Sequence, residues 1–119
     1  MRNWYDTPVK RYEAINLFTK TLAQRTDNVS KKKVANKVML SNLMKIFDEE
    51  NRHIHGQGHY ETYGKREEGT LWTAYNAATY WSSHPDSKRG SSPHNVKVNR
   101  EDKVRKMLAS PEWEALEAA

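Results

Sequence analysis

The sequence contains no cysteine among its 119 residues. Disulfide bonds and thiolate metal sites are therefore excluded, which fits a reducing compartment such as the cytoplasm. No apolar run approaches the roughly 20 residues that a membrane-spanning helix needs. The first residues lead directly into polar sequence, so we expect neither a membrane segment nor a signal peptide. These absences predict a cytoplasmic protein that does not bind membranes.

Acidic side chains are also in deficit. The chain carries 15 Asp and Glu residues against 20 Lys and Arg residues, a net charge of +5. A basic surface favours an anionic partner, of which nucleic acid is the commonest. At this length we expect a single domain, residues 1–119, with a modest hydrophobic core.

The densest aromatic segment is GTLWTAYNAATYWSSH, residues 69–84. We expect Gly69 to end whatever precedes it, Thr70 to cap a helix and His84, which precedes a proline, to close it. On a helix of 3.6 residues per turn, one broad face gathers alanines and large apolar side chains. That face consists of Leu71, Ala74, Tyr75, Ala77, Ala78 and Trp81. The pattern predicts a central aromatic helix over about residues 70–83.

Two helices are predicted before it. Asp6 or Thr7 caps the first, Pro8 occupies its first turn, and an amphipathic pattern continues to Gln24. The second extends over residues 30–54. Because its apolar face rotates along the way, we expect a break near residues 36–41.

Segments 55–69 and 85–98 have the composition of long, flexible loops. Asn99 then caps a further helix, and Ser110-Pro111 begins a short final segment that docks through Trp113. No β-hairpin is predicted. The fold class is therefore an all-α bundle of four to five helices around the aromatic helix.

The apolar positions predict one shared core, onto which Trp4 and Tyr5 fold back as a hydrophobic anchor. The predicted core residues are Phe18, Leu22, Leu43, Phe47, Leu71, Tyr75, Ala78 and Trp81.

The segment G-T-L-W-x-A-Y-N-A-A-T-Y-W-x-x-H, preceded by an apolar helix and a glycine- and charge-rich loop, resembles the C-terminal region of a family of phage- or plasmid-like proteins of unknown function. Members carry a similar G-T-x-W-x-x-x-N-A-x-T-x-x-x-x-H pattern. Here it falls on Gly69, Thr70, Trp72, Asn76, Ala77, Thr79 and His84.

The resemblance covers residues 9–84. Family members are usually two to three times longer, and the sequence after His84 departs from their usual ending. The resemblance implies a phage, prophage or plasmid gene acting in a bacterial cytoplasm, and it implies no particular reaction.

The sequence gives little support to metal binding or catalysis. His53, His55 and His59 lie close in sequence. However, His53 and His55 point to different sides of a helix end, and His59 follows two glycines, which disfavours a metal site. Residues 48–51 fan around a helix instead of converging as an acid–base pair. No nucleophile elbow or phosphate loop is present. We therefore expect a protein without enzymatic activity, metal or cofactor.

Trp72 and Asn76 lie on the other side of the aromatic helix. Asn76 is costly inside a helix unless its amide is hydrogen-bonded. One interpretation is that the amide binds the edge of a base or peptide beside the Trp72 ring. The favoured interpretation is structural, with the amide bonded to the backbone of segment 56–69.

Lys31, Lys32 and Lys33 begin a predicted helix, where their charges oppose the helix macrodipole. Fold stability does not explain them, so a partner is indicated. Further cations follow in the loops and the last helix: Lys65, Arg66, Lys88, Arg89, Lys97, Arg100, Lys103, Arg105 and Lys106.

Tyr60 and Tyr63 lie beside Lys65 and Arg66 in the first loop. Aromatic rings among cations suit single-stranded nucleic acid, whose bases stack and whose phosphates pair. A solvated face is the alternative, since acidic residues dilute this loop. The candidate partner-binding residues are Lys31, Lys32, Lys33, Tyr60, Tyr63, Lys65, Arg66, Trp72, Asn76, Lys88 and Arg89.

These observations favour a phage accessory protein that binds nucleic acid in recombination or replication. The alternative is a protein-binding inhibitor of a host factor, such as an anti-defence, anti-CRISPR-like protein. Both hypotheses use the same small, charged surface.

Overall fold

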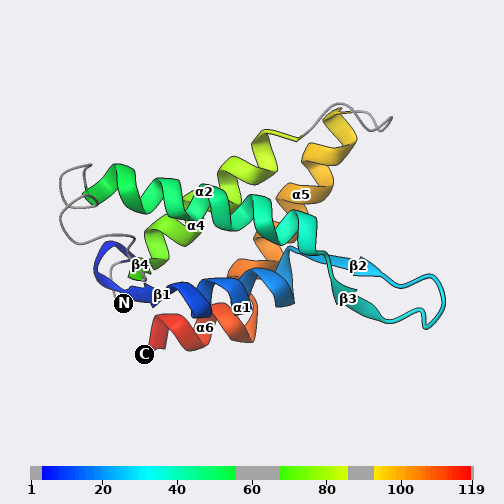
Figure 1. Cartoon of the computed structure of the whole chain (residues 1–119), viewed down its shortest axis with the longest axis horizontal. Helices are drawn as coiled ribbons and strands as arrows, with labels where there is room; N and C mark the ends of the chain where they lie inside the picture. The colour runs from blue at the N-terminus through cyan, green and yellow to red at the C-terminus, as the bar shows by residue number, and fades with distance from the viewer. Residues whose placement is uncertain (1–3, 56–67, 86–92, 119) are drawn as a thin grey trace.

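The structure is a computed structural model that describes residues 4–55, 68–85 and 93–118. Five helices dominate these residues (Figure 1): α1 (Arg11–Thr21), α2 (Lys37–His55), α4 (Leu71–Ser83), α5 (Pro93–Leu108) and α6 (Pro111–Ala118). A short 3-10 helix, η1 (Trp4–Asp6), precedes them. Four three-residue strands complete the fold: β1 (Pro8–Lys10), β2 (Gln24–Thr26), β3 (Lys33–Ala35) and β4 (Glu68–Thr70). The protein is mostly helical, but the prediction of a purely α-helical fold is wrong.

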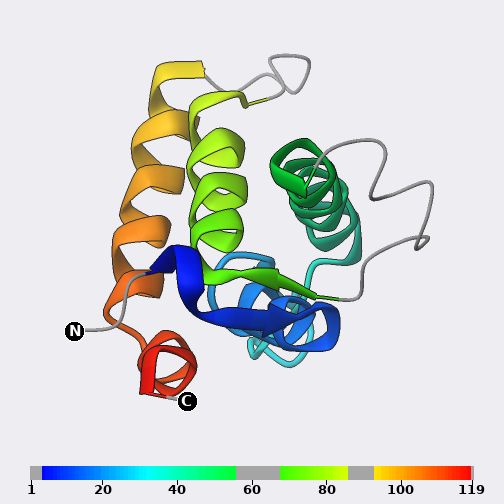
Figure 2. The same cartoon turned by 90° about the vertical axis from the view of Figure 1, so that its left-hand side faces the viewer.

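The aromatic segment forms α4 with the predicted ends. The Thr70 hydroxyl accepts a hydrogen bond from Thr73 N at 3.2 Å, and His84 is the C-terminal cap residue. Figure 2 shows α4 antiparallel to α5 on one side and facing α2 on the other. The alanines of α4 are fully buried, which lets both neighbouring helices approach closely.

The chain enters α1 through a strand and not through the predicted helix start. Pro8–Lys10 pairs antiparallel with Glu68–Thr70, with Val9 opposite Gly69. Leu71 N donates to Thr7 O at 3.0 Å, which joins the start of α4 to this sheet. Val9 is fully buried. Long-range pairing and the burial of Val9 therefore override the helix-start signal of the sequence.

The second predicted helix is also corrected. β2 and β3 form an antiparallel hairpin with Arg25 opposite Val34, so the absence of a hairpin was a wrong prediction. α2 begins only at Lys37. Asn36 Oδ1 accepts from Met39 N at 3.1 Å, so Asn36 caps the helix inside the region where a break was expected.

The helix that was predicted to begin at Asn99 begins earlier in the structure. α5 starts at Pro93, so residues 93–98 are helical and Asn99 lies within the helix. In the other predicted loop, His55 ends α2, and Glu68 and Gly69 belong to β4. Residues 56–67 and 86–92 lie outside the described residues. α6 follows the predicted Ser110 start, with Trp113 N donating to Ser110 Oγ at 3.2 Å.

One hydrophobic core joins the helices, as predicted. It contains Phe18, Leu22, Leu43, Phe47, Leu71, Ala78 and Trp81, with Tyr75 half-buried against it. Of the predicted anchor, Trp4 packs against the core, with its ring 5.3 Å from that of Trp113. Tyr5 is exposed, and its ring lies 4.6 Å from that of Trp72.

A contact that the sequence did not predict joins α1 to α2. Arg11 Nε and Nη2 donate to the two carboxylate oxygens of Asp48 at 3.1 and 3.0 Å. Such two-pronged pairing fixes the orientation of both side chains.

Among the described helices, none combines the length and the apolar composition that crossing a membrane requires.

Candidate nucleic-acid interface

The β2–β3 hairpin projects from the helical body (Figure 1). Over residues 24–35 it carries four cationic side chains, Arg25, Lys31, Lys32 and Lys33, against the single carboxylate of Asp27. All four cationic residues are exposed. The prediction that the three lysines begin a helix is therefore wrong; Lys31 and Lys32 belong to the hairpin turn and its exit, and Lys33 begins β3.

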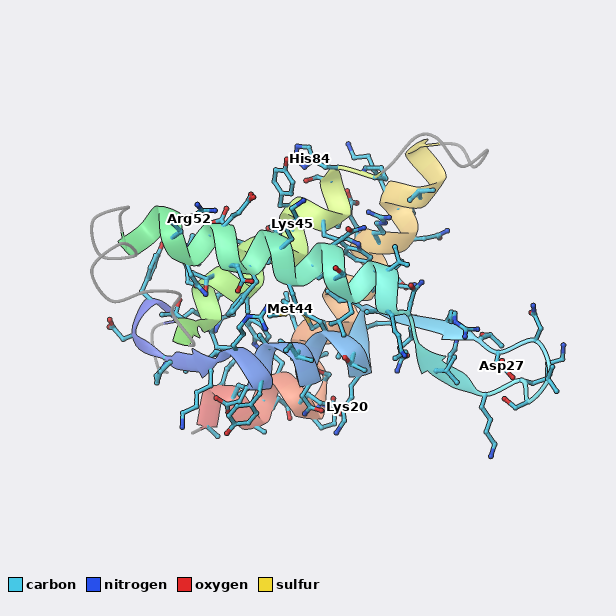
Figure 3. The ribbon with its side chains drawn as sticks, viewed as in Figure 1. Lys20, Asp27, Met44, Lys45, Arg52 and His84 are labelled. Atoms are coloured by element: carbon cyan, nitrogen blue, oxygen red, sulfur yellow. The ribbon has the colours of Figure 1, made fainter. Side chains whose placement is uncertain are left out.

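Asp27 builds the turn of this hairpin (Figure 3). Its Oδ2 accepts from Ser30 N at 2.8 Å, and its backbone carbonyl accepts from Lys31 N at 2.9 Å. Hydrogen bonds from the backbone and hydroxyl of Ser30 are the main reason that the pKa of Asp27 is lowered, and the charge of Arg25 contributes. The carboxylate thus organises the turn that presents the lysines.

Lys31 occupies a backbone conformation that lysine rarely adopts. Its φ angle is +61°, in the left-handed region that glycine and asparagine enter at less cost. The chain nevertheless has a charged side chain at this position. The turn therefore keeps a cation where local stability favours glycine.

The charges of Lys33 in β3 and Arg100 in α5 both act on Lys103 in α5. The pKa of Lys103 is lowered, first by burial and then by the charges of Lys33 and Arg100. Among the described residues, Lys103 forms no ion pair. Like charges held together raise the free energy of the folded state, and a bound anion relieves this cost. We call Lys33, Arg100 and Lys103 the cationic cluster.

Arg100 is held in a defined position. Its guanidinium carbon lies 4.6 Å from the centroid of the Trp81 ring, and its Nη1 donates to Trp81 O at 2.9 Å. Cation–π contact and a hydrogen bond together limit the freedom of a long side chain. α4 therefore positions one member of the cationic cluster.

Other cations of α5 have a different role. Asp102 pairs with Arg105 and, at 3.1 Å, with Lys106 Nζ. The sequence showed all these basic residues, but not which of them face the hairpin and which pair along their own helix. Only the tertiary structure separates the two sets, because Lys103 is affected by the charge of Lys33 whereas Arg105 and Lys106 pair with Asp102.

The structure separates Trp72 from the predicted lysines. Trp72 lies in the first turn of α4, half-buried against Tyr5 and Tyr75. This helix begins at the end of the molecule opposite the hairpin (Figure 1). Asn76 is half-buried one turn further along, and most of its predicted partner segment lies outside the described residues. The remaining predicted partner-binding residues also lie outside the described residues: Tyr60, Tyr63, Lys65, Arg66, Lys88 and Arg89.

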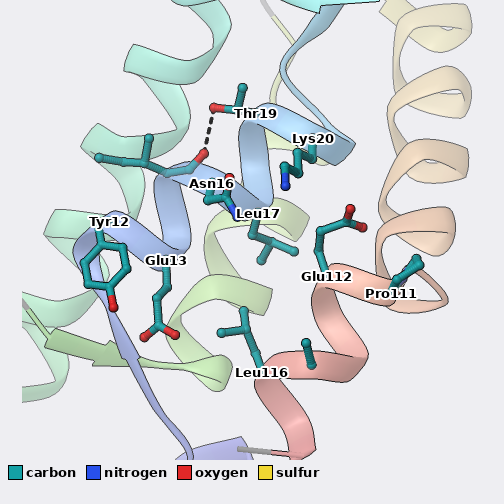
Figure 4. Close-up of a pocket in the computed structure, with 11 residues that line it drawn as sticks. Tyr12, Glu13, Asn16, Leu17, Thr19, Lys20, Pro111, Glu112 and Leu116 are labelled. Carbon is teal, nitrogen blue, oxygen red and sulfur yellow. Dashed lines mark hydrogen bonds between the residues drawn. The ribbon is translucent and has the colours of Figure 1, made fainter.

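A separate groove lies between α1 and α6 (Figure 4). Its volume is about 880 Å³, and Tyr12, Leu17, Lys20, Glu112 and Leu116 are among its lining residues. Both signs of charge occur on its rim. The groove resembles a protein-contact surface more than an anion site.

Within the described part of the chain, no three side chains of the His, Asp or Glu type gather into a group able to hold a metal ion. The side chains of His53, His55 and His59 lie outside that part. Comparison with protein-family models, curated proteins and solved structures gives no match. The assignment of function therefore rests on the surface of this molecule.

Proposed function

We propose that this protein is a non-enzymatic phage accessory protein that binds nucleic acid in the cytoplasm of a bacterial host, in recombination or replication. The observation that carries the proposal is the projecting hairpin (Figure 1), on which Arg25, Lys31, Lys32 and Lys33 are all exposed. Lys33 is also distant in sequence from Arg100 and Lys103, and repulsion between its charge and that of Lys103 has a cost in stability. The phosphate backbone of a nucleic acid is a partner that offsets this cost.

The proposal takes α4 as the helix around which the bundle is organised. α4 contacts both α2 and α5, and Trp81 positions Arg100. The hairpin adds Arg25, Lys31 and Lys32 beyond the cluster, so the cationic surface extends from the helical body along a projecting arm. Such an arm suits contact with the backbone of a nucleic acid whatever its sequence.

The test is a titration of labelled single-stranded DNA at several salt concentrations, including about 0.15 M, where casual surface attraction is screened within roughly 8 Å. We expect affinity to fall steeply with salt, because each neutralised phosphate releases condensed counterions. Changing Lys32 and Lys33 to Gln together is expected to weaken binding and to flatten the salt slope by about two phosphates' worth.

The control changes Lys10 and Lys20 to Gln together, which removes the same charge from β1 and α1. If both double variants lose the same affinity, binding reflects net charge alone and the hairpin is not the interface. Absence of binding by the wild type at about 0.15 M salt would contradict the proposal itself.

The second candidate is a protein-binding inhibitor of a host factor. The groove between α1 and α6 favours it, since Tyr12 is 67% exposed at its edge and tyrosine is enriched in protein interfaces. This function predicts a defined complex with a host protein that Tyr12→Ala weakens and the Lys32 and Lys33 changes leave intact.

A further inference from the structure

A second cavity lies beside the cationic cluster. It has a volume of about 420 Å³ and lies between the first half of α2, the last turns of α4 and the first half of α5. This volume is in the range of small-ligand sites. Its polar and aromatic lining residues are Asn36, Asn42, Tyr80, Trp81, His84 and Arg100.

Aromatic rings form one wall of the cavity. The Tyr80 and His84 rings stack with centroids 3.9 Å apart and planes 14° from parallel, and Tyr80 is 49% exposed. Figure 3 places His84 at the end of α4. A flat aromatic surface that is open to solvent stabilises a nucleobase by stacking, whatever the base.

Two amides supply polar groups to the same space. Asn42 is exposed at the rim, and Asn36 Oδ1 is already engaged by Met39 N in the cap of α2. The amide nitrogens of both side chains are donors suited to the acceptor atoms on the edge of a base. The cavity therefore combines a stacking surface with hydrogen-bonding groups.

Arg100 belongs both to this cavity and to the cationic cluster. Asn36, on the opposite wall, directly follows the strand that Lys33 begins. Arg100 therefore places a positive charge in the lining of the same cavity as the aromatic wall. This arrangement matches a nucleotide, which joins an aromatic base to an anionic phosphate.

We propose that this cavity binds one unpaired base of a single-stranded nucleic acid whose phosphates contact the cationic cluster. The inference rests on the proposed function and adds a base-binding site to it. A base-paired duplex can present such a base only at the free-energy cost of unpairing and unstacking it. The site therefore selects single strands through Tyr80 and His84.

The test compares two labelled oligomers of equal length at about 0.15 M salt, one of thymidine and one with the same phosphates but no bases. We expect the wild type to bind the thymidine oligomer at least about fivefold more tightly, since stacking of one base contributes about that much or more. Tyr80→Ala is expected to bring the ratio of the two affinities, thymidine oligomer over baseless oligomer, close to one. It is expected to leave the affinity for the baseless oligomer unchanged.

Two further variants sharpen the result. Asn42→Trp at the exposed rim fills the cavity without removing a core side chain and is expected to lower the same ratio. Tyr12→Ala removes an exposed tyrosine from the other groove and is expected to leave the ratio as in the wild type. Thermal unfolding of each variant shows whether it is folded.

The outcomes separate this inference from the proposed function. If the wild type binds both oligomers and Tyr80→Ala and Asn42→Trp preserve its ratio, the cavity does not bind a base, although the cationic surface still binds phosphates. An equal loss of the ratio in Tyr12→Ala also overturns the base-binding site. If the wild type binds neither oligomer, both proposals fail.

Discussion

The backbone of Gly69 in β4 lies directly against the amide of Asn51 in α2. A methyl group at Gly69 would lie 2.5 Å from Asn51 Oδ1 and 2.7 Å from Phe47 Cζ. Real contacts of such atoms are longer, so a side chain at this position cannot be accommodated without movement. The sheet and the helix therefore meet through glycine because only a residue without a side chain leaves enough room.

We expect Gly69→Ala to lower the free energy of unfolding by about 1–3 kcal/mol, the usual cost of overpacking. Urea unfolding measures this change. In an Asn51→Ala background the same substitution is expected to cost less, because the closest clashing atoms are gone and the two effects are then non-additive. Equal costs in both backgrounds would show that Asn51 does not set the limit.

Leu43 is fully buried in the core. Leu43→Ala is expected to cost about 2–5 kcal/mol, the range for emptying a packed leucine site. Val38 lies in the same helix but is 63% exposed, so Val38→Ala is expected to change stability by less than about 0.5 kcal/mol. Similar melting temperatures for the two variants would contradict the assigned core face of α2.

Lys31→Gly separates stability from binding. Glycine adopts the observed φ freely, although it also gains freedom in the unfolded chain. We expect the free energy of unfolding to stay unchanged or to rise by up to about 1 kcal/mol, while affinity for single-stranded DNA falls. Lys32→Gly, at a residue with ordinary φ, is the control and is expected to lower stability. If Lys31→Gly binds DNA as tightly as the wild type, the charge at this turn has no part in binding.

Lys103→Met is expected to raise stability at neutral pH and to weaken DNA binding. The pKa of Lys103 is lowered, so its charged form is disfavoured in the folded protein. The stability of the wild type therefore rises as pH increases through that lowered pKa, and the gap between variant and wild type narrows there. Lys106→Met, which instead loses the pair with Asp102, is the control. A Lys103→Met variant less stable than the wild type at pH 7 would contradict the repulsion.

The hairpin turn is expected to loosen in acid. The folded structure lowers the pKa of Asp27, so its carboxylate stabilises the turn above about pH 4, the ordinary Asp value. That contribution is lost as pH falls through the lowered pKa. Hydrogen exchange at the Ser30 amide reports the loss. Asp27→Asn keeps an acceptor for Ser30 N and removes the titratable carboxylate. In this variant the protection of the Ser30 amide is therefore expected to vary less with pH.

Local signals in the sequence were sufficient for several elements. Thr70 and Ser110 begin helices where expected, and His84 ends α4 before a proline, because capping and proline chemistry act between neighbouring residues. Apolar periodicity likewise identified the core, including Leu43 and Phe47. These features depend on contacts within one turn or on the spacing of one helix.

Strand pairing was decided by tertiary contacts and not by local sequence signals. β1 and β4 lie about 60 residues apart in sequence, and three residues are too few to show the alternation of a strand. Pro8 and the lysine triplet therefore carried helix-start and helix signals, and the tertiary partner overrode them. The same reason explains why the hairpin was missed.

The sequence by itself determined the charge excess, the helical bulk and the identity of the basic residues. Only the tertiary structure decided that the charge of Lys33 acts on Lys103, and that residues of α2 and α5 line one cavity with Tyr80 and His84. Both features depend on short distances between segments far apart along the chain, whereas the stack of Tyr80 on His84 joins residues four apart at one helix end. No local pattern encodes such distances, because they are fixed by the packing of α2 and α5 against α4 and by the placement of the hairpin.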